Sequence, residues 1–284
     1  MRWRKLERSD NVQDRRGASA GKVAGGVGGL GIIGVLLALF LGGGGGGLTD
    51  ALQGLGAGGG TATQTEQAQP PEYAGLDDVE DFIRAILGST ETVWTDVFAN
   101  SGRTYQPAAL VLFTDFTDSA CGGANSQVGP HYCPVDKTIY IDRGFYAELE
   151  RFGATGGDFA EAYVVAHEVA HHVQNELGVM DEVRSAQQSD PNNRNAYSVS
   201  LELQADCLAG VWANYIFTLG DVLERGDIEE ALNAAAAVGD DRIQEVTQDG
   251  QINPETWTHG SSQERVDWFT TGYQTGDASQ CNTF

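Results

Sequence analysis

A charge-free stretch is the sequence feature that most constrains how this chain folds. Of the 284 residues, those from 23 to 49 include no charged side chain. Residues 23–41 would form a helix roughly 28 Å long at ~1.5 Å per residue, about the thickness of a bilayer core. Six of these 19 residues are glycine, which weakens the helix. The pattern predicts one transmembrane helix over residues 23–41.

The charges on either side of this stretch are opposite in sign. Residues 1–22 hold seven basic and three acidic residues, and the rest of the chain holds ten basic and 37 acidic. The positive-inside rule then makes residues 1–22 a basic cytoplasmic leader of a single-pass cell-membrane protein with an extracytoplasmic domain. A cleaved signal peptide shares the basic start, but this leader is long and no clean cleavage site follows. The acidic remainder would repel nucleic acid, so we expect no such partner.

Composition and periodicity divide the rest of the chain. Residues 42–72, rich in Gly, Thr, Gln and Pro, predict a flexible linker, and residues 73–284 a globular domain. Apolar spacing predicts helices at 76–87, 92–98, 158–177, 195–219, 228–238 and 263–273, and strands at 109–113 and 138–141. The fold class is therefore α+β, mostly helical with a small sheet. The sequence leaves the oligomeric state open.

Four cysteines, at 121, 133, 207 and 281, fall in the predicted extracytoplasmic domain. An even number there indicates two disulfides, for which three connectivities exist. We favour Cys121–Cys133, which closes a short loop rich in Gly and Pro, together with Cys207–Cys281, which ties the C-terminus to a helix. Four free thiols would instead fit a cytoplasmic domain. A thiolate zinc site is disfavoured because no C-x-x-C spacing occurs.

The sequence HEVAH (residues 167–171) lies within the predicted helix 158–177, where Asp158 and Glu161 have the spacing of a capping box. At ~100° per residue, His167 and His171 project from one face and can hold one metal ion. Glu168, turned ~100° from His167, lies beside that ion, where it can take a proton from a zinc-activated water.

A mononuclear zinc peptidase needs a third protein ligand and an open position for water. The best candidate ligand is Glu202, on the next long helix. Asp206 lies one turn later on the same face, where its carboxylate can accept the outward N–H of a ligand histidine and fix its tautomer. Because Glu202 and Asp206 have this spacing on a second helix, a chance match of the five-residue motif is much less credible.

Matching segments along nearly the whole chain resemble the neutral zinc metallopeptidases, membrane-anchored bacterial proteins. These segments are residues 9–12, 14–17, 90–94, 119–122, 132–134, 166–174, 202–207, 258–262 and 265–266. One departure is His131, at a position where the family suggests Phe. The resemblance implies a zincin-like fold, with Zn²⁺ held by His167, His171 and a Glu as in the gluzincins. It also suggests that His259 stabilises the oxyanion of the reaction.

The remaining candidates have plainer interpretations. His172, rotated ~100° from His171, is expected to pack in the helix interface or support the site from behind. His131 is expected to be structural or exposed. Tyr163, one turn before His167, would line the cleft or, more simply, pack in the core.

We therefore expect a membrane-anchored zinc peptidase that hydrolyses peptide bonds in peptide or protein substrates. Two alternatives stay open. One is a membrane-tethered zinc-binding module without protease activity, in which four protein ligands would close the site. The other is a zinc hydrolase acting on a non-protein amide, which uses the same chemistry.

Overall fold

The computed structural model describes residues 1–16, 77–125, 128–248 and 250–284. The predicted transmembrane helix (23–41) and linker (42–72) lie outside these ranges and stay predictions. Among the helices that the structure does describe, none has the length and apolar character needed to cross a bilayer.

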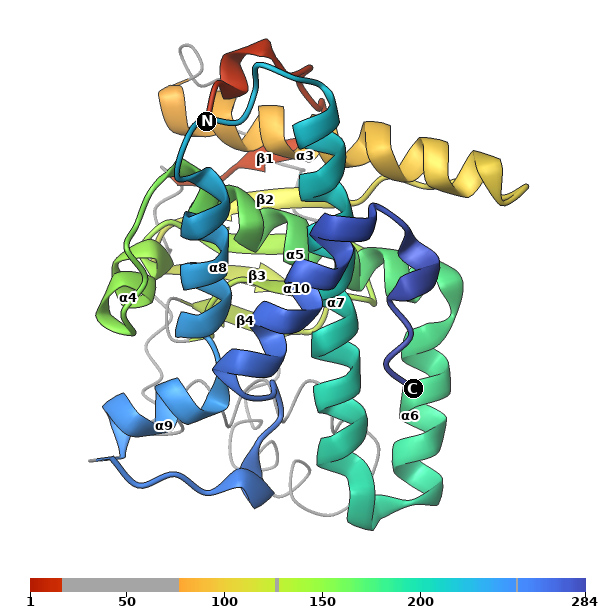
Figure 1. Ribbon diagram of the computed structural model, residues 1–284, viewed down its shortest axis with the longest axis vertical. Helices are drawn as coiled ribbons and strands as arrows, with labels where there is room; N and C mark the ends of the chain where they lie inside the picture. Colours follow the sequence, from red (N-terminus) through yellow and green to blue (C-terminus); the bar gives the residue numbers. More distant parts are fainter. Residues whose placement is uncertain (17–76, 126–127, 249) are drawn as a thin grey trace, which may run out of the picture.

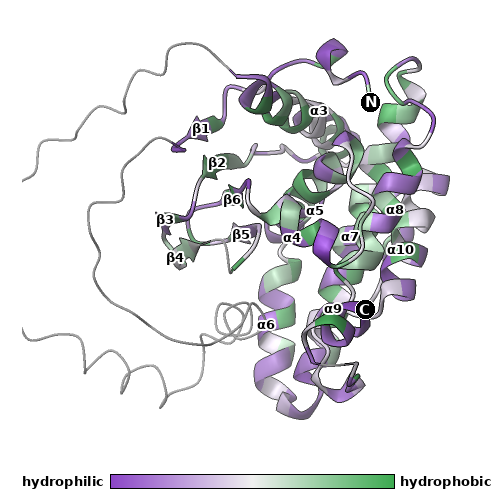
Figure 2. Cartoon of the chain, turned by 90° about the vertical axis from the view of Figure 1, so that its left-hand side faces the viewer, coloured by the Kyte–Doolittle hydropathy of each residue, from purple (hydrophilic) through white to green (hydrophobic). Residues whose placement is uncertain are grey.

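A four-stranded sheet lies along one side of a set of helices (Figure 2). Its order is β1-β2-β6-β5, with β1, β2 and β6 parallel and β5 antiparallel. The strands are β1 Val12–Asp14, β2 Ala109–Phe113, β5 His131–Cys133 and β6 Thr138–Asp142, and a separate hairpin pairs β3 Phe116–Ser119 with β4 Gly122–Asn125. The two predicted strands, β2 and β6, are confirmed as the buried centre of the sheet.

Helices make up most of the described chain (Figure 1). They are α3 Asp78–Asn100, α4 Phe145–Arg151, α5 Asp158–Leu177, α6 Val179–Ser189, α7 Arg194–Thr218, α8 Asp227–Ala237, α9 Asp240–Thr247 and α10 Ser262–Thr275. The predicted central helix matches α5 at both ends, and α7, α8 and α10 lie close to their predicted bounds. The α+β class with a small sheet is thus confirmed.

The two helices predicted at 76–87 and 92–98 are one continuous helix, α3. Gly88 does not break it. A Cβ at this position would lie 2.5 Å from the carbonyl oxygen of Glu7. The glycine therefore lets the N-terminal segment pack closely against α3. The hydroxyl of the next residue, Ser89, donates a hydrogen bond within the helix, to the carbonyl of Ile86 (2.6 Å).

The predicted capping box at the start of α5 is wrong. Its N-cap is Gly157, with φ +117°, and no side chain caps the helix from that position. Asp158 instead accepts a hydrogen bond from the Met1 amine (2.6 Å), and the Phe159 N–H donates to Glu230 of α8 (3.1 Å). Contacts with other parts of the fold thus satisfy the polar groups that the capping-box pattern expected to hydrogen-bond to each other.

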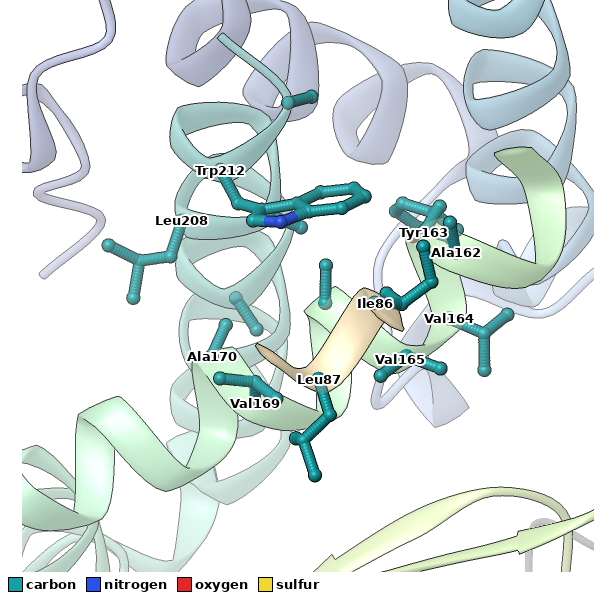
Figure 3. Packing of buried hydrophobic residues seen from close by; sticks show 14 of the residues in the cluster. Ile86, Leu87, Ala162, Tyr163, Val164, Val165, Val169, Ala170, Leu208 and Trp212 are labelled. Carbon is teal, nitrogen blue, oxygen red and sulfur yellow. The ribbon is translucent and has the colours of Figure 1, made fainter. Parts of the chain in front are cut away.

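The core is built around α5. Phe159 of α5 stacks on Trp212 of α7, with ring centroids 5.5 Å apart. Figure 3 shows Trp212 of α7, Ile86 of α3 and Val165 of α5 among the buried apolar side chains that gather between these helices. All four side chains are fully buried. Burial on so many sides fixes the position of the helix that carries the HEVAH sequence.

The N-terminal segment, residues 1–16, packs on the same body as residues 77–284. The Trp3 ring meets Phe82 of α3 edge-to-face, with centroids 5.5 Å apart, and the Ser9 N–H donates to the carbonyl of Arg84 (2.9 Å). Further along, Val12 pairs with Leu110 as β1 joins the sheet. Residues 1–16 therefore pack against residues 77–284 in this structure, whereas the predicted division of the chain assigns them to different parts.

This packing bears on the predicted anchor. A chain that crossed a bilayer once between residues 23 and 41 would place residues 1–16 and 77–284 on opposite faces. The docked segment and a single crossing therefore exclude each other, and a single-pass form would require residues 1–16 to undock.

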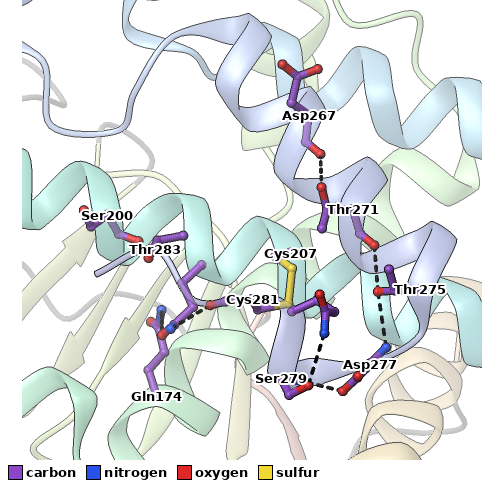
Figure 4. Close-up of a disulfide and its surroundings, with 12 residues drawn as sticks. Gln174, Ser200, Cys207, Asp267, Thr271, Thr275, Asp277, Ser279, Cys281 and Thr283 are labelled. Atoms are coloured by element: carbon purple, nitrogen blue, oxygen red, sulfur yellow. Dashed lines mark hydrogen bonds between the residues drawn. A yellow bond between two sulfur atoms is a disulfide. The ribbon is translucent and has the colours of Figure 1, made fainter.

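Both favoured disulfides are confirmed. Cys121 pairs with Cys133 beside β4 and β5, and Cys207 of α7 pairs with Cys281 near the C-terminus (Figure 4). The second bridge joins two cysteines that are 74 residues apart in the sequence. It holds the last residues of the chain against the helix that carries Glu202.

Replacing Trp3 tests whether the N-terminal segment is part of the folded unit. Trp3 is 8% exposed, so Trp3→Ala should lower the free energy of unfolding of the full chain by about 3 kcal/mol. Urea titration followed by circular dichroism measures this, with the exposed β1 residue changed in Gln13→Ala as a control expected to stay within about 0.5 kcal/mol. Equal stability of Trp3→Ala and wild type would show that the segment is undocked in solution.

Candidate metal centre

Three side chains from two helices bring their ligand atoms together. His167 and His171 of α5 and Glu202 of α7 each offer one atom, and these atoms lie within 4.8 Å of one another. All three residues are buried. The structure therefore brings together the three residues that the sequence predicted as metal ligands.

The spacing of these atoms fits one tetrahedral ion. His167 Nε2 lies 3.1 Å from Glu202 Oε2, and His171 Nε2 lies 3.4 Å from Glu202 Oε1. Two ligand atoms bonded to one tetrahedral zinc at ~2.0–2.1 Å are roughly 3.3 Å apart. The Glu202 carboxylate, one oxygen toward each imidazole, thus lies at distances from both nitrogens that are close to the separation of two ligands of one ion.

His167 is oriented from behind by a buried carboxylate. Its Nδ1 lies 2.9 Å from Asp206 Oδ1, which also accepts from the Tyr163 hydroxyl (2.5 Å). Arg265 of α10 donates to the same carboxylate through Nε (2.8 Å) and Nη2 (3.0 Å). Because Asp206 accepts at Nδ1, Nε2 is the nitrogen that faces Glu202 and the metal position, and it is free to bind a metal once its proton is lost. Asp206 thus contacts one of the two histidines, at the position from which the sequence predicts that it supports a metal ligand.

Close helix packing brings Arg265 to this carboxylate. A Cβ on Gly210 of α7 would overlap the Phe269 carbonyl of α10, and one on Gly272 would overlap the Cys207 carbonyl. The two glycines therefore allow α7 and α10 to cross with their backbones in contact. Arg265, 2% exposed, lies beyond this crossing and neutralises a carboxylate that is fully buried.

His171 is oriented by an amide. Its Nδ1 lies 2.8 Å from Gln174 Oε1, one turn further along α5. The two imidazoles meet edge-to-face with centroids 4.8 Å apart. Each of the two histidines thus has its Nδ1 hydrogen-bonded to a side-chain oxygen and its Nε2 directed toward Glu202.

Glu168 differs from every other acidic group around the site. The residue is 7% exposed, and its carboxylate, which has no hydrogen-bond or ion-pair partner within the part of the chain that the structure describes, is not among the solvent-excluded polar groups. A carboxylate that is open to solvent and not engaged by another described side chain is available to accept a proton from a water molecule. Its position directly after His167 places it beside the three ligands.

His259 lies in the loop before α10 and is held by Asp240 at the start of α9. Its Nδ1 is 3.1 Å from Asp240 Oδ1, while Asp240 Oδ2 accepts the backbone N–H groups of Thr258, His259 and Gly260. The negative charges of Asp240 and Glu202 raise the pKa of His259 against the opposing effect of burial. The charge of Glu202, a candidate metal ligand, therefore acts on His259.

The charges within the cluster balance one another. Burial lowers the pKa of His167, but Asp206 and Glu202 outweigh it and raise that pKa to about 9. Burial likewise opposes ionisation of Glu202, yet His171 and His167 hold its pKa well below the usual value. In the metal-free protein a proton on His167 therefore compensates the Glu202 carboxylate, in the position where a cation would do so.

The other histidines are structural. His172 Nδ1 lies 3.0 Å from the Tyr132 hydroxyl and its Nε2 lies 2.6 Å from the Gln106 carbonyl, which confirms it as a packing residue. His131 is buried and stacks on Tyr140, with centroids 5.3 Å apart. Tyr163 packs in the core, as expected, and its hydroxyl also reaches Asp206.

Sequence reasoning gave no role to Arg265, Gln174 or Asp240. Two of them lay in segments already recognised as matching a family, 166–174 and 265–266, which was the available signal. Their roles depend on where the helices cross, and helical periodicity does not contain that information.

Comparison with known proteins identifies the family. The chain is 44% identical over 291 residues to the uncharacterized protein YpfJ of Escherichia coli K12, covering 100% of this chain and 99% of that protein. It is 48% identical over 206 residues to the uncharacterized protein Rv2575 of Mycobacterium tuberculosis H37Rv, covering 69% of this chain and 67% of that protein. No solved structure matches. A family model described as "Putative neutral zinc metallopeptidase" matches residues 1–284, and the chain belongs to this family.

Proposed function

We propose that this protein is a zinc-dependent peptidase of the gluzincin type, with a zincin-like domain in which His167, His171 and Glu202 hold Zn²⁺. The observation that carries the proposal is the convergence of three ligand groups next in sequence to Glu168, a carboxylate with no partner among the described residues. A site that only stabilised the fold would have no need of a free carboxylate there. The predicted anchor and extracytoplasmic location stay proposals that this function does not require, and the single-pass form applies only with residues 1–16 undocked.

Each residue has a distinct task in the proposed reaction. A bound zinc ion supplies a Lewis acid that polarises a carbonyl and lowers the pKa of water to about 7. Glu168 takes a proton from the attacking water and passes it to the leaving amine. His259, held by Asp240, donates a hydrogen bond to the oxygen of the scissile carbonyl as negative charge develops on it. Asp206 and Gln174 keep the two imidazoles in the binding tautomer.

The number of ligands supports catalysis over a closed structural site. In the described ranges, the cluster around His167 contains three metal-binding side chains. A structural zinc site is closed by four protein ligands, whereas a catalytic one keeps a position for water. A hydrolase of a non-protein amide would use the same residues, and substrate profiling distinguishes it from a peptidase.

Replacing the proposed base should separate metal binding from catalysis. Glu168→Gln should retain zinc and lower the rate of cleavage of fluorescein-labelled casein by about 10²–10⁴-fold, because an amide cannot take the proton. Glu202→Ala should lose most of the bound zinc, measured by atomic absorption. Glu176→Gln, on the same helix but paired with Lys137, is the control and should behave as wild type. Undiminished cleavage by Glu168→Gln would rule out the mechanism.

Zinc affinity should depend on pH through His167. Its pKa of about 9 means that the imidazole is protonated at neutral pH and must lose that proton to bind metal. The dissociation constant for zinc should therefore fall by about tenfold per pH unit between pH 7 and 9 and level off above pH 9. Competition with a chelator of known pH dependence measures this. If the affinity for zinc did not change between pH 7 and 9, the assignment of His167 as a metal ligand would be contradicted.

His259 should affect turnover and not metal content. His259→Ala removes a hydrogen bond made to the reacting oxygen, so kcat should fall by about 10²-fold while bound zinc stays at one per chain. Kinetics on a quenched fluorescent peptide that the wild type cleaves, alongside metal analysis, provide the readout. A loss of zinc would instead indicate a structural or ligand role.

A further inference from the structure

The amide that orients His171 has its own orientation fixed by the backbone. Gln174 Nε2 lies 2.7 Å from the Leu201 carbonyl oxygen. A carbonyl oxygen can only accept, so the nitrogen of the amide must face it and the amide oxygen must face His171. The fully buried Gln174 therefore has one permitted orientation.

That orientation decides the tautomer of His171. Gln174 Oε1 accepts, so His171 Nδ1 must carry the proton, and Nε2 keeps its lone pair for a metal. Asp206 does the same for His167 with a negative charge, whereas Gln174 does it with a neutral group. A second carboxylate at this position would add an uncompensated buried charge.

A second glutamine extends this arrangement away from the site. Gln174 Nε2 also donates to Gln204 Oε1 of α7 (3.1 Å), and Gln204 Nε2 donates to the Cys281 carbonyl oxygen (2.9 Å). This last acceptor is again a backbone carbonyl, which fixes the second amide as it fixed the first. Every donor in the relay therefore points away from His171, toward the C-terminus.

A covalent bond holds the far end of the relay. Cys281 is bonded to Cys207, which lies one turn after Gln204 on α7 (Figure 4). Thr283 adds a hydrogen bond to the Ser200 carbonyl (2.6 Å). The terminal segment, which follows the short helix η4 Ala278–Gln280, is thereby held against the helix that carries Glu202.

We propose that Gln174 and Gln204 are positioning residues for zinc, and that the Cys207–Cys281 disulfide fixes the carbonyl on which their relay ends. The inference rests on the proposed zinc site and extends it to residues that do not touch the metal. Loss of any member of the relay frees the His171 ring to rotate or change tautomer, which weakens zinc binding without removing a ligand.

Zinc affinity of the full chain tests the relay. Gln174→Met and Gln204→Met keep side-chain length but remove the amides, and each should raise the dissociation constant for zinc by about tenfold or more in chelator competition. Gln187→Met is the matched control. Gln187 is a buried glutamine of α6 that donates to the Arg194 carbonyl and the Ser198 hydroxyl, so its loss costs hydrogen bonds of the same kind away from His171. Its zinc affinity should equal that of wild type.

The disulfides provide a second pair of variants. Cys207→Ala with Cys281→Ala should raise the dissociation constant for zinc, whereas Cys121→Ala with Cys133→Ala should leave it unchanged. If the first pair does not fold, Gln204→Met, with its disulfide intact, still decides the question. Equal zinc affinity of Gln174→Met, Gln204→Met and Gln187→Met would overturn the relay while leaving the metal site in place. Absence of zinc binding by wild type would overturn the proposed function and the relay together.

Discussion

The hydrogen bonds and ion pair of the buried Asp206 carboxylate are the interactions on which the rest of the site depends. It lies on α7, accepts from His167 and Tyr163 of α5, and receives two hydrogen bonds from Arg265 of α10. Three helices are thus joined at one fully buried charge. Removing one member of such a pair leaves the other uncompensated, at a cost of about 3–5 kcal/mol. The close crossing of α7 and α10 through Gly210 and Gly272 makes this arrangement attainable, because bulkier residues would hold Arg265 too far away.

The two ligand histidines are oriented by different chemistry. His167 faces an anion whose charge is balanced by an arginine, and His171 faces a neutral amide fixed by backbone carbonyls. Together with Glu202 the site thus gathers one metal-facing carboxylate and one supporting carboxylate around two imidazoles, with Arg265 3.9 Å from Glu202. This balance is consistent with binding a single divalent cation, and Glu168 remains outside it as a carboxylate with no described partner.

The sequence contains more information about which residues could form the candidate site than about the body that holds it. His167, His171, Glu202 and Asp206 follow from helical periodicity within two long helices, and periodicity is a local property. The contacts of Arg265 and Gln174 and the capping of α5 depend on which helices meet, so the local sequence does not predict them. The N-terminal strand was missed for a related reason. Trp3, Leu6 and Val12 are scattered among charged residues and resemble a leader, and only their packing against α3 and β2 shows that they belong to the core.

The central claim is that His167, His171 and Glu202 bind zinc with one position left for water. X-ray absorption at the zinc edge of the metal-loaded full chain tests it most directly. We expect four nitrogen or oxygen ligands at about 2.0–2.1 Å, with multiple scattering from two imidazoles. Three or more imidazoles, or a sulfur near ~2.3 Å, would contradict it.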